Sequence, residues 1–260
     1  MSKHISLILI GCIVLLMLGA GLYYYQNVLA EQSVTVDHNK NATSSKKITQ
    51  QSTSERKLHE NKKTDHTNIK ASDNIVALTF DDGPNTTSTK KILEILKRQN
   101  VQATFFMVGT QVEKNEAMVK QVKEEGHEIA SHTYSHKNLM TGTSAEIEKE
   151  VGDLNRLFKR ITGSEPKYLR PPFGVYDTYN REKFGMPIAL WNEDSQDWVS
   201  RDSEKIKTQV LNAIRPQSVV LFHDIYAETA AVIESIIESL KEKNYHFVSV
   251  TDYYKIIKIN

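Results

Sequence analysis

Two adjacent carboxylates follow a hydrophobic stretch and are the first candidates for chemistry. The segment IVALTFDDGP places Asp81 and Asp82 directly after the apolar residues 75–80. Two like charges side by side repel each other, and burial makes each of them more costly. Asp-Gly-Pro is also typical of a solvated turn. The pair by itself therefore leaves two interpretations open, a turn or a reactive site.

Two histidines lie four residues apart in the segment SHTYSH, at His132 and His136. On a helical turn they would share a face and could hold one metal ion. On an extended strand they would lie ~13 Å apart and could not. With one carboxylate from a neighbouring strand, the pair predicts an Asp-His-His set. Three protein ligands and a vacant fourth position are typical of a catalytic site of the zinc type.

Two neighbouring acids are favourable if one of them binds a dication and the other stays free as a general base. The dication relieves the repulsion between them. A second proton carrier is then needed for the leaving group, and His223 in VVLFHD suits the role of general acid. Asp197 can stabilise the charged form of that histidine, and Arg170 can hold the free aspartate ionised and oriented.

These residues follow segments that alternate between strand-like and helix-like patterns. We expect strands at residues 75–80, 103–108, 128–131, 168–170, 188–191, 219–222 and 247–250, and helices at 89–99, 111–125, 143–163 and 230–243. Such alternation predicts a parallel sheet, open or closed as a small irregular barrel. Sites in parallel α/β folds gather at the carboxyl ends of strands. Nearly every expected strand end here carries a titratable or hydrogen-bonding group, which predicts an active site.

The N-terminal segment is apolar. Residues 5–25 contain no charged side chain, and at ~1.5 Å per residue they can cross a ~30 Å hydrocarbon core. Lys3 precedes the run and no Lys or Arg follows it closely, which predicts that the remainder of the chain is outside the cell. We expect residues 1–25 to be a membrane anchor. The alternatives are cleavage near Ala30, with secretion of the remainder, and lipidation at Cys12.

Residues 26–73 are expected to form a disordered tether, because residues 31–73 contain no aromatic residue, no Gly and no Pro and cannot bury enough surface to fold. Residues 74–260 then form one domain. The chain has a formal charge of +1, of which the first thirty residues carry +1 and residues 31–73 carry +2. The domain is therefore slightly acidic, which does not favour nucleic-acid binding. No obligate protein partner is implied.

Five motifs occur in a fixed order: TFDDGP, SHTYSH, RPPFG, DSQDW and LFH. With the connecting segments ATFFMVG and EEGHEIASH, the domain resembles polysaccharide deacetylases of the NodB-homology type, and among these the peptidoglycan N-acetylglucosamine deacetylases. The resemblance runs from about residue 75 to the C-terminus. It implies a distorted (β/α)7 barrel and metal-assisted hydrolysis of an N-acetyl group, which yields acetate and a free amine on the sugar.

The resemblance also implies a role for each candidate residue. The implied roles are the base (Asp81), its orientation (Arg170), the general acid (His223), tuning of that acid (Asp197), metal binding (Asp82, His132, His136), oxyanion and substrate binding (the Phe173 backbone N–H, and Pro172), and the acetyl pocket (Trp198, Leu221). Zinc is the expected metal, with cobalt or manganese as alternatives.

Two features of the sequence depart from the family pattern. Phe173 stands where the family often has Tyr, and the segment between Gly174 and Ile188 is too short for a full helix. We therefore expect a less complete barrel and a wider groove on that side.

The sequence is compatible with three functions. The first function is a membrane-tethered, extracellular deacetylase of cell-wall glycan. The second acts on poly-N-acetylglucosamine, chitin oligomers or, as an esterase, acetylated xylan. The third is a carbohydrate-binding domain that has lost catalysis.

Overall fold

The computed structural model describes residues 69–177 and 181–257. The expected anchor, residues 1–25, lies outside the described residues, and so does the expected tether except for its last five residues. Within the described ranges, no helix combines the length and the apolar character that crossing a membrane requires.

Strand β1 (Ile75–Asp81) lies at the centre of the sheet and is buried over its whole length. Its side chains alternate between two faces, as in any strand. Leu78 and Phe80 belong to the large core beneath the outer helices, whereas Ala77 belongs to a second core on the opposite face. Asp81 lies four residues after Ala77 and therefore shares its face. An apolar strand thus delivers a carboxylate to the inner side of the sheet.

All strand pairs in the sheet are parallel. The strands are β2 (Thr104–Met107), β3 (Glu128–Ser131), β4 (Glu193–Asp194), β5 (Ser218–His223) and β6 (His246–Phe247), in the order β3-β2-β1-β5-β4 with β6 paired to β1. In this register Asp81 lies opposite Phe106 on one side and opposite His223 on the other. The carboxyl ends of β1 and β5 therefore meet, and they bring two of the expected catalytic residues together.

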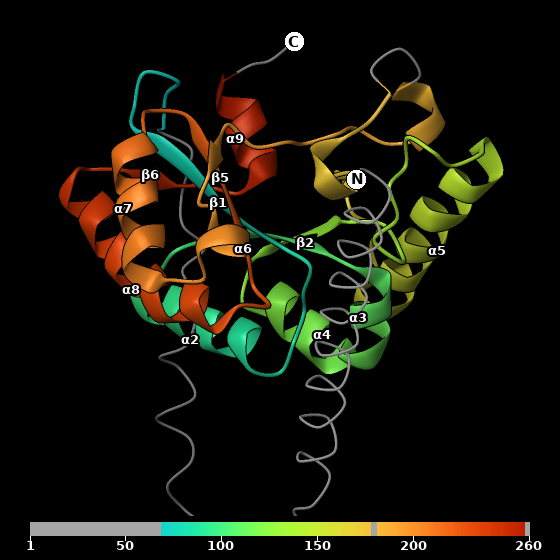
Figure 1. The fold of residues 1–260 in the computed structure, drawn as a ribbon, viewed down its shortest axis with the longest axis horizontal. Coiled ribbons are helices and arrows are strands. Elements are labelled where there is room, and N and C mark those ends of the chain that lie inside the picture. Colours follow the sequence, from blue (N-terminus) through green and yellow to red (C-terminus); the bar gives the residue numbers. More distant parts are fainter. Residues whose placement is uncertain (1–68, 178–180, 258–260) are drawn as a thin grey trace, which may run out of the picture. The chain divides into compact units, whose positions relative to one another are not determined.

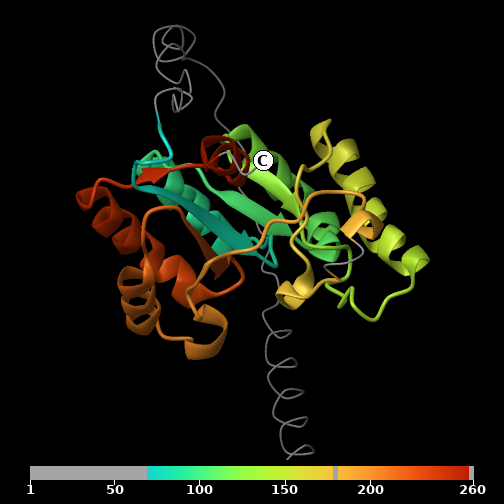
Figure 2. The same cartoon turned by 90° about the horizontal axis from the view of Figure 1, so that it is seen from above.

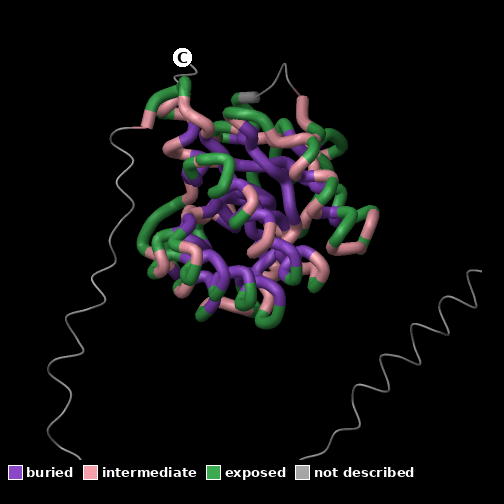
Figure 3. The backbone as a smooth tube through the Cα atoms, turned by 90° about the vertical axis from the view of Figure 1, so that its left-hand side faces the viewer, coloured by how far each residue is buried: buried purple, intermediate pink, exposed green. Residues whose placement is uncertain are grey.

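Helices surround the strands. They are α2 (Ser88–Gln99), α3 (Gly109–Lys114), α4 (Glu116–Glu124), α5 (Ser144–Thr162), α6 (Asp197–Ser200), α7 (Ser203–Ala213), α8 (Ala227–Glu242) and α9 (Val250–Ile257). Helices α7 and α8 lie on one side of the strands and α5 on the other (Figures 1 and 2). Helix α9 packs against β1. The buried residues gather on the strands and on the inward faces of the helices (Figure 3).

The helix expected at residues 143–163 is confirmed as α5. Thr143 accepts a hydrogen bond from the backbone N–H of Glu146, and the Glu146 carboxylate accepts one from the Thr143 N–H, which is a capping box. Gly163 ends the helix with φ 78°, a conformation that glycine adopts without a steric penalty. The apolar stripe of the helix is buried, so α5 is fixed to the sheet beside β3.

Two predicted strands are reduced to short pairings. Leu169 forms isolated parallel bridges to Ser131 and to Ile188. Residues 188–194 then continue to β4, which pairs with β5, so this segment links the β3 side of the sheet with β5. Prolines flank these segments at positions 171, 172 and 187. Proline has no backbone N–H to donate, which limits regular pairing.

Three further elements differ from the prediction. The helix expected at 111–125 is divided into α3 and α4 at Asn115, whose side-chain amide donates to the carbonyl of Pro84. The strand expected at 247–250 ends early, because Val250 begins α9. Ser249 caps that helix by accepting from the N–H of Asp252. Helix α7 was not predicted. Among the described residues of the short segment after Gly174, the 3-10 helix η2 (Arg181–Phe184) is the one helical element.

Candidate metal and catalytic site

The three expected metal ligands converge at the carboxyl end of the sheet. Asp82, His132 and His136 offer ligand atoms that all lie within 4.8 Å of one another. The Asp82 Oδ1 atom lies 3.3 Å from His136 Nε2 and 3.5 Å from His132 Nε2. No other cluster of this kind occurs in the described part of the chain.

The backbone that carries these ligands is irregular. Asp82 has φ 77°, Thr133 has φ 67° and His136 has φ 57°, all in the left-handed region. Neither of the two backbone geometries considered for the histidine pair, a helical turn and an extended strand, occurs, since the chain after β3 forms bends instead. The two rings still lie with their centroids 5.0 Å apart. Left-handed conformations are costly for residues with side chains and persist where surrounding structure imposes them, often at functional sites.

The donor atoms fit a divalent cation. Asp82 Oδ1 is buried and has no hydrogen-bond partner, although buried polar atoms are almost always paired. His132 Nδ1 donates to the carbonyl of Arg170 at 2.6 Å, which leaves the lone pair on Nε2 toward Asp82. Burial lowers the pKa of His132 to about 3, although Asp82 opposes the shift. The imidazole is therefore neutral at physiological pH, the form that binds metals.

Asp81 is held by a buried arginine. The Arg170 guanidinium donates through one nitrogen to Asp81 Oδ1 at 2.7 Å and to Thr79 Oγ1 at 2.8 Å. Its Nε donates to the carbonyl of Ala189 at 3.1 Å. Burial raises the pKa of Asp81, and the positive charge of Arg170 counteracts that shift. The second carboxylate oxygen, Oδ2, lies 3.6 Å from His132 Nε2, so it faces the metal-ligand cluster.

Aromatic rings hold Arg170 in place. Its Cζ lies 3.9 Å from the ring centroid of Phe106 and 5.4 Å from that of Trp191. Trp191 packs against the second core while remaining partly accessible. Gly174 has φ 69°, and a Cβ there would lie 2.7 Å from the Trp191 ring. The loop that carries Pro172 and Phe173 therefore lies directly against this tryptophan.

Phe173 and Pro172 lie beside the ligand cluster. Pro172 is buried, while Phe173 has φ 62° and is 65% exposed. The Phe173 ring contacts the ring of His136 edge to face, with centroids 4.9 Å apart. The side chain thus forms an open apolar surface next to one ligand.

His223 and Asp197 form a second, tightly bonded pair. His223 Nδ1 lies 2.7 Å from Asp197 Oδ1, and the His223 backbone N–H donates to Oδ2 at 2.7 Å. Thr229 Oγ1 also donates to Oδ2 at 2.7 Å. Burial lowers the pKa of His223, but the hydrogen bond and charge of Asp197, with help from Asp81 and Asp82, raise it to about 9. The imidazole is therefore protonated at neutral pH.

Trp198 and Leu221 differ in their surroundings. Leu221 is buried on β5, opposite Thr79 of β1. Trp198 is 55% exposed, and its indole N–H donates to Asp194 Oδ2 at 3.4 Å. The structure thus gives the expected pocket residues one buried wall and one open edge.

Several residues around the site were not identified from the sequence. Thr79 accepts a hydrogen bond from Arg170, and Thr229 donates one to Asp197. The Tyr226 ring lies beside His223, and Arg201 lies over that ring. The period-2 pattern of β1 places Thr79 on the same face as Asp81 and could have identified it. The others depend on contacts between distant segments.

Comparisons with known proteins place the chain in a family. Residues 68–185 match the sequence model of the polysaccharide deacetylase family. The peptidoglycan-N-acetylglucosamine deacetylase PgdA of Listeria monocytogenes is 36% identical over 179 residues, covering 69% of this chain and 38% of the relative. A peptidoglycan-N-acetylglucosamine deacetylase of Bacillus cereus is 34% identical over 186 residues, covering 68% of this chain and 87% of the relative.

A solved structure agrees with these matches. The peptidoglycan deacetylase PdaC from Bacillus subtilis superposes with a TM-score of 0.70 at 33% identity, covering 73% of this chain and 94% of that one. The chain belongs to the polysaccharide deacetylase family and has its parallel α/β fold. It spans less than two fifths of the length of the Listeria relative.

Proposed function

We propose that this chain is a metal-dependent hydrolase that removes N-acetyl groups from N-acetylglucosamine in cell-wall peptidoglycan. The observation that carries the proposal is the convergence of three kinds of group at one sheet end. Asp81 presents a carboxylate oxygen 3.6 Å from the ligand His132, and it lies opposite His223 in the strand register. A base, a set of metal ligands and an acid therefore surround one small volume, as hydrolysis of an amide requires.

The residues divide the proton transfers between them. Asp81 accepts a proton from the attacking water while the water oxygen bonds to the acetyl carbon. Arg170 keeps Asp81 oriented and ionised despite the burial of Asp81. His223, protonated at neutral pH, then donates its Nε2 proton to the sugar nitrogen as the carbon–nitrogen bond breaks. Asp197 holds the imidazolium through Nδ1. The products are acetate and a free amine.

Asp82, His132 and His136 would hold the cation, and we propose that it is zinc, with cobalt or manganese as alternatives. The set of two imidazoles and one carboxylate suits zinc and its neighbours in the first transition row. A bound dication supplies Lewis-acid polarisation of the acetyl carbonyl and of water. The unpartnered, buried Asp82 Oδ1 supports this assignment.

The remaining site residues would bind the substrate. The backbone N–H of Phe173, beside Pro172, is proposed to stabilise the developing oxyanion. Trp198 and Leu221 are proposed to enclose the acetyl methyl group. Support comes from the short loop of Phe173 against His136 and from the position of Leu221 on β5, next to the strand that ends in Asp81.

We further propose the arrangement of the whole chain. Residues 1–25 would anchor it in the membrane, and residues 26–73 would tether the catalytic domain, residues 74–260, outside the cell. A flexible tether of this length has a root-mean-square span of ~35 Å, enough to reach glycan strands near the membrane. The link through residues 188–194 supports the distorted (β/α)7 barrel. Secretion after cleavage near Ala30 is the alternative.

Acetate release tests the proposal. The soluble domain, residues 74–260, is incubated with purified peptidoglycan and zinc, and acetate and muropeptide masses are measured. We expect acetate together with the mass loss of one acetyl group on N-acetylglucosamine. Release only from chitin oligomers, poly-N-acetylglucosamine or acetylated xylan would keep the chemistry and replace the substrate. Absence of release from all of them, with metal bound, would favour a binding domain.

A further inference from the structure

An arginine and a tyrosine outside the family motifs lie beside the general acid. The Tyr226 ring lies with its centroid 5.6 Å from that of His223. The Arg201 Cζ lies 3.6 Å from the Tyr226 ring centroid, which is a cation–π contact. The three side chains therefore form a row that leads from the general acid to a guanidinium group.

Both residues are fixed by the elements that carry the acid pair. Arg201 ends helix α6, whose first residue is Asp197, and its backbone N–H donates to the Asp197 carbonyl at 3.3 Å. Arg201 has φ 47°, a left-handed conformation that is unfavourable for an arginine unless its surroundings impose it. Tyr226 follows His223 by three residues and begins helix α8. Their positions relative to His223 are thus set by short, rigid connections.

The Tyr226 hydroxyl remains protonated and can donate a hydrogen bond. Burial raises the pKa of Tyr226, and the negative charge of Asp82 raises it further. The phenol is therefore neutral over the physiological range.

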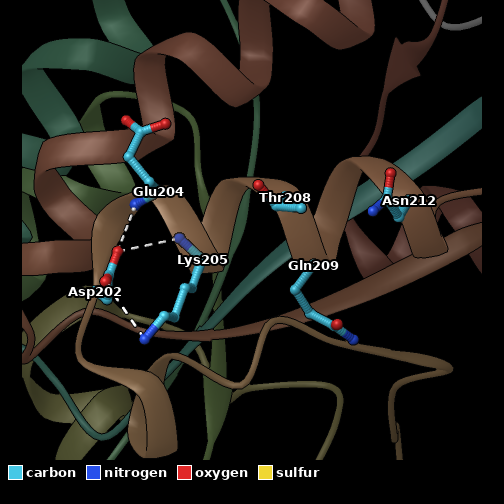
Figure 4. A pocket seen from close by; sticks show the side chains of 6 residues that line it. All are labelled: Asp202, Glu204, Lys205, Thr208, Gln209 and Asn212. Carbon is cyan, nitrogen blue, oxygen red and sulfur yellow. Dashed lines mark hydrogen bonds and ion pairs between the residues drawn. The ribbon is translucent and has the colours of Figure 1, made fainter.

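Arg201 keeps part of its donor capacity free. Its side chain is 45% exposed, and one terminal nitrogen lies 3.3 Å from Glu228 Oε2. The neighbouring acid, Asp202, is engaged elsewhere: it accepts from the N–H groups of Glu204 and Lys205 at the beginning of α7 and pairs with the Lys205 ammonium (Figure 4). Arginine has five N–H donors, so the contacts of Arg201 with Glu228 and with the Tyr226 side chain leave other donors for a ligand.

We propose that Arg201 and Tyr226 recognise a carboxylate on the glycan next to the sugar that is deacetylated. This inference rests on the proposed function and names the substrate class as an anionic aminoglycan, such as one with lactyl or peptide carboxylates. Arginine binds carboxylates in a bidentate manner, and the phenol adds a neutral donor. Neutral polymers of the chitin type offer no such group.

The test compares two forms of one substrate. A soluble peptidoglycan tetrasaccharide is used in its native form and after chemical amidation of its carboxylates, and kcat/KM is measured for each from acetate release. The variants are R201A, R201K and E228Q. R98A is the matched control, because Arg98 also forms an exposed ion pair, with Glu234 on α8. Melting temperatures verify that each variant is folded.

The proposal predicts a change in the ratio of the two rates. Because a charge-assisted hydrogen bond is strong, the ratio of native to amidated kcat/KM falls about tenfold in R201A. R201K restores part of it, and R98A keeps the wild-type ratio. E228Q raises the ratio, since it removes the competing carboxylate. If R201A lowers kcat/KM equally on both substrates, and so leaves their ratio unchanged, the proposal is overturned. If E228Q does not raise the ratio, Glu228 does not compete with the ligand carboxylate for Arg201.

A binding measurement separates this inference from the proposed function. The Kd values of both tetrasaccharides are measured for D81N and for D81N combined with R201A, which need no turnover. We expect R201A to weaken binding of the native form about tenfold relative to the amidated form. If the wild-type chain releases no acetate from either form, the proposed function fails, while these Kd values still support or overturn carboxylate recognition.

Discussion

The two halves of the candidate site are built differently. In the ligand half, Asp82 Oδ1 is buried without a hydrogen-bond partner. Two of the three ligands, Asp82 and His136, have left-handed backbone conformations. In the acid half, Asp197 is fully buried, and its carboxylate receives hydrogen bonds from the imidazole and backbone of His223 and from Thr229. The protein completes the hydrogen bonds of the second half by itself, whereas the first half has a buried acceptor with no hydrogen-bond partner.

This contrast separates what each half requires. Hydrogen bonds hold His223 in one orientation, so the acid half should keep its geometry whether or not a cation is bound. The ligand half gathers a carboxylate and two imidazoles, and burial keeps the His132 imidazole neutral by lowering its pKa. A bound cation would offset the repulsion between the converging donor atoms. Substitutions in one half should therefore affect metal content, and substitutions in the other should affect proton transfer.

The largest effect is expected in the ligand half. The variant His132→Ala should lose bound metal and at least about 10³-fold in kcat, because the dication supplies several kcal/mol of transition-state stabilisation. Metal content by mass spectrometry and acetate release are measured together. His246→Ala, which changes an exposed histidine at the opposite end of β1, serves as the control. Full metal content in His132→Ala would contradict the ligand assignment.

The acid half should respond differently. Asp197→Asn removes the charge that holds the His223 imidazolium and should lower kcat about 10²-fold. The metal content should stay that of the wild type. Because Asp197 raises the pKa of His223, the variant should also lose activity at a lower pH than the wild type does. A variant that loses metal instead would abolish the distinction between the two halves.

The wild-type pH profile gives an intermediate effect. His223 must be protonated to act as an acid, so kcat should fall about tenfold per pH unit above its pKa of about 9. The same raised pKa stabilises the folded chain below the unfolded value near 6.5, and this contribution disappears as the pH rises through about 9. A kcat that stays constant to pH 11 would rule out His223 as the acid.

The smallest effect concerns support of the acid pair. Thr229→Val removes one donor to Asp197 and should lower the free energy of unfolding by about 1–2 kcal/mol, with a several-fold loss in kcat. Urea unfolding measures the first effect and acetate release the second. Thr208→Val, at an exposed position on α7 (Figure 4), is the matched control and should change neither quantity. Wild-type behaviour of Thr229→Val would show that the buried bond is dispensable.

The sequence was informative where chemistry or burial constrains residue type. Continuous apolar residues predicted β1 and β5, and the carboxyl-end rule placed Asp81 and His223 near each other. The spacing of His132 and His136 predicted that both bind one metal ion, but it did not predict the irregular turn that brings the two rings together. That turn depends on Thr133 and His136 in left-handed conformations, which the sequence does not signal because neither is a glycine.

Other features depend on contacts that no local pattern encodes. Helix α7 has only two buried residues, Ile206 and Val210, so its apolar period was too weak to detect. Ser249 and Asp252 have the spacing of a helix N-terminal cap, so the sequence does signal the start of α9, and the prediction of a strand at Val250 was wrong. Arg201 and Tyr226 are 25 residues apart in the chain, and only the folded arrangement brings Arg201 against the Tyr226 ring.

Removal and return of the metal test the central claim most directly. The domain is stripped with a chelator, its metal content is verified by mass spectrometry, and acetate release from peptidoglycan is measured before and after addition of zinc. The account predicts no release from the stripped protein and recovery with one equivalent of zinc. Full activity in a verified metal-free sample would contradict it.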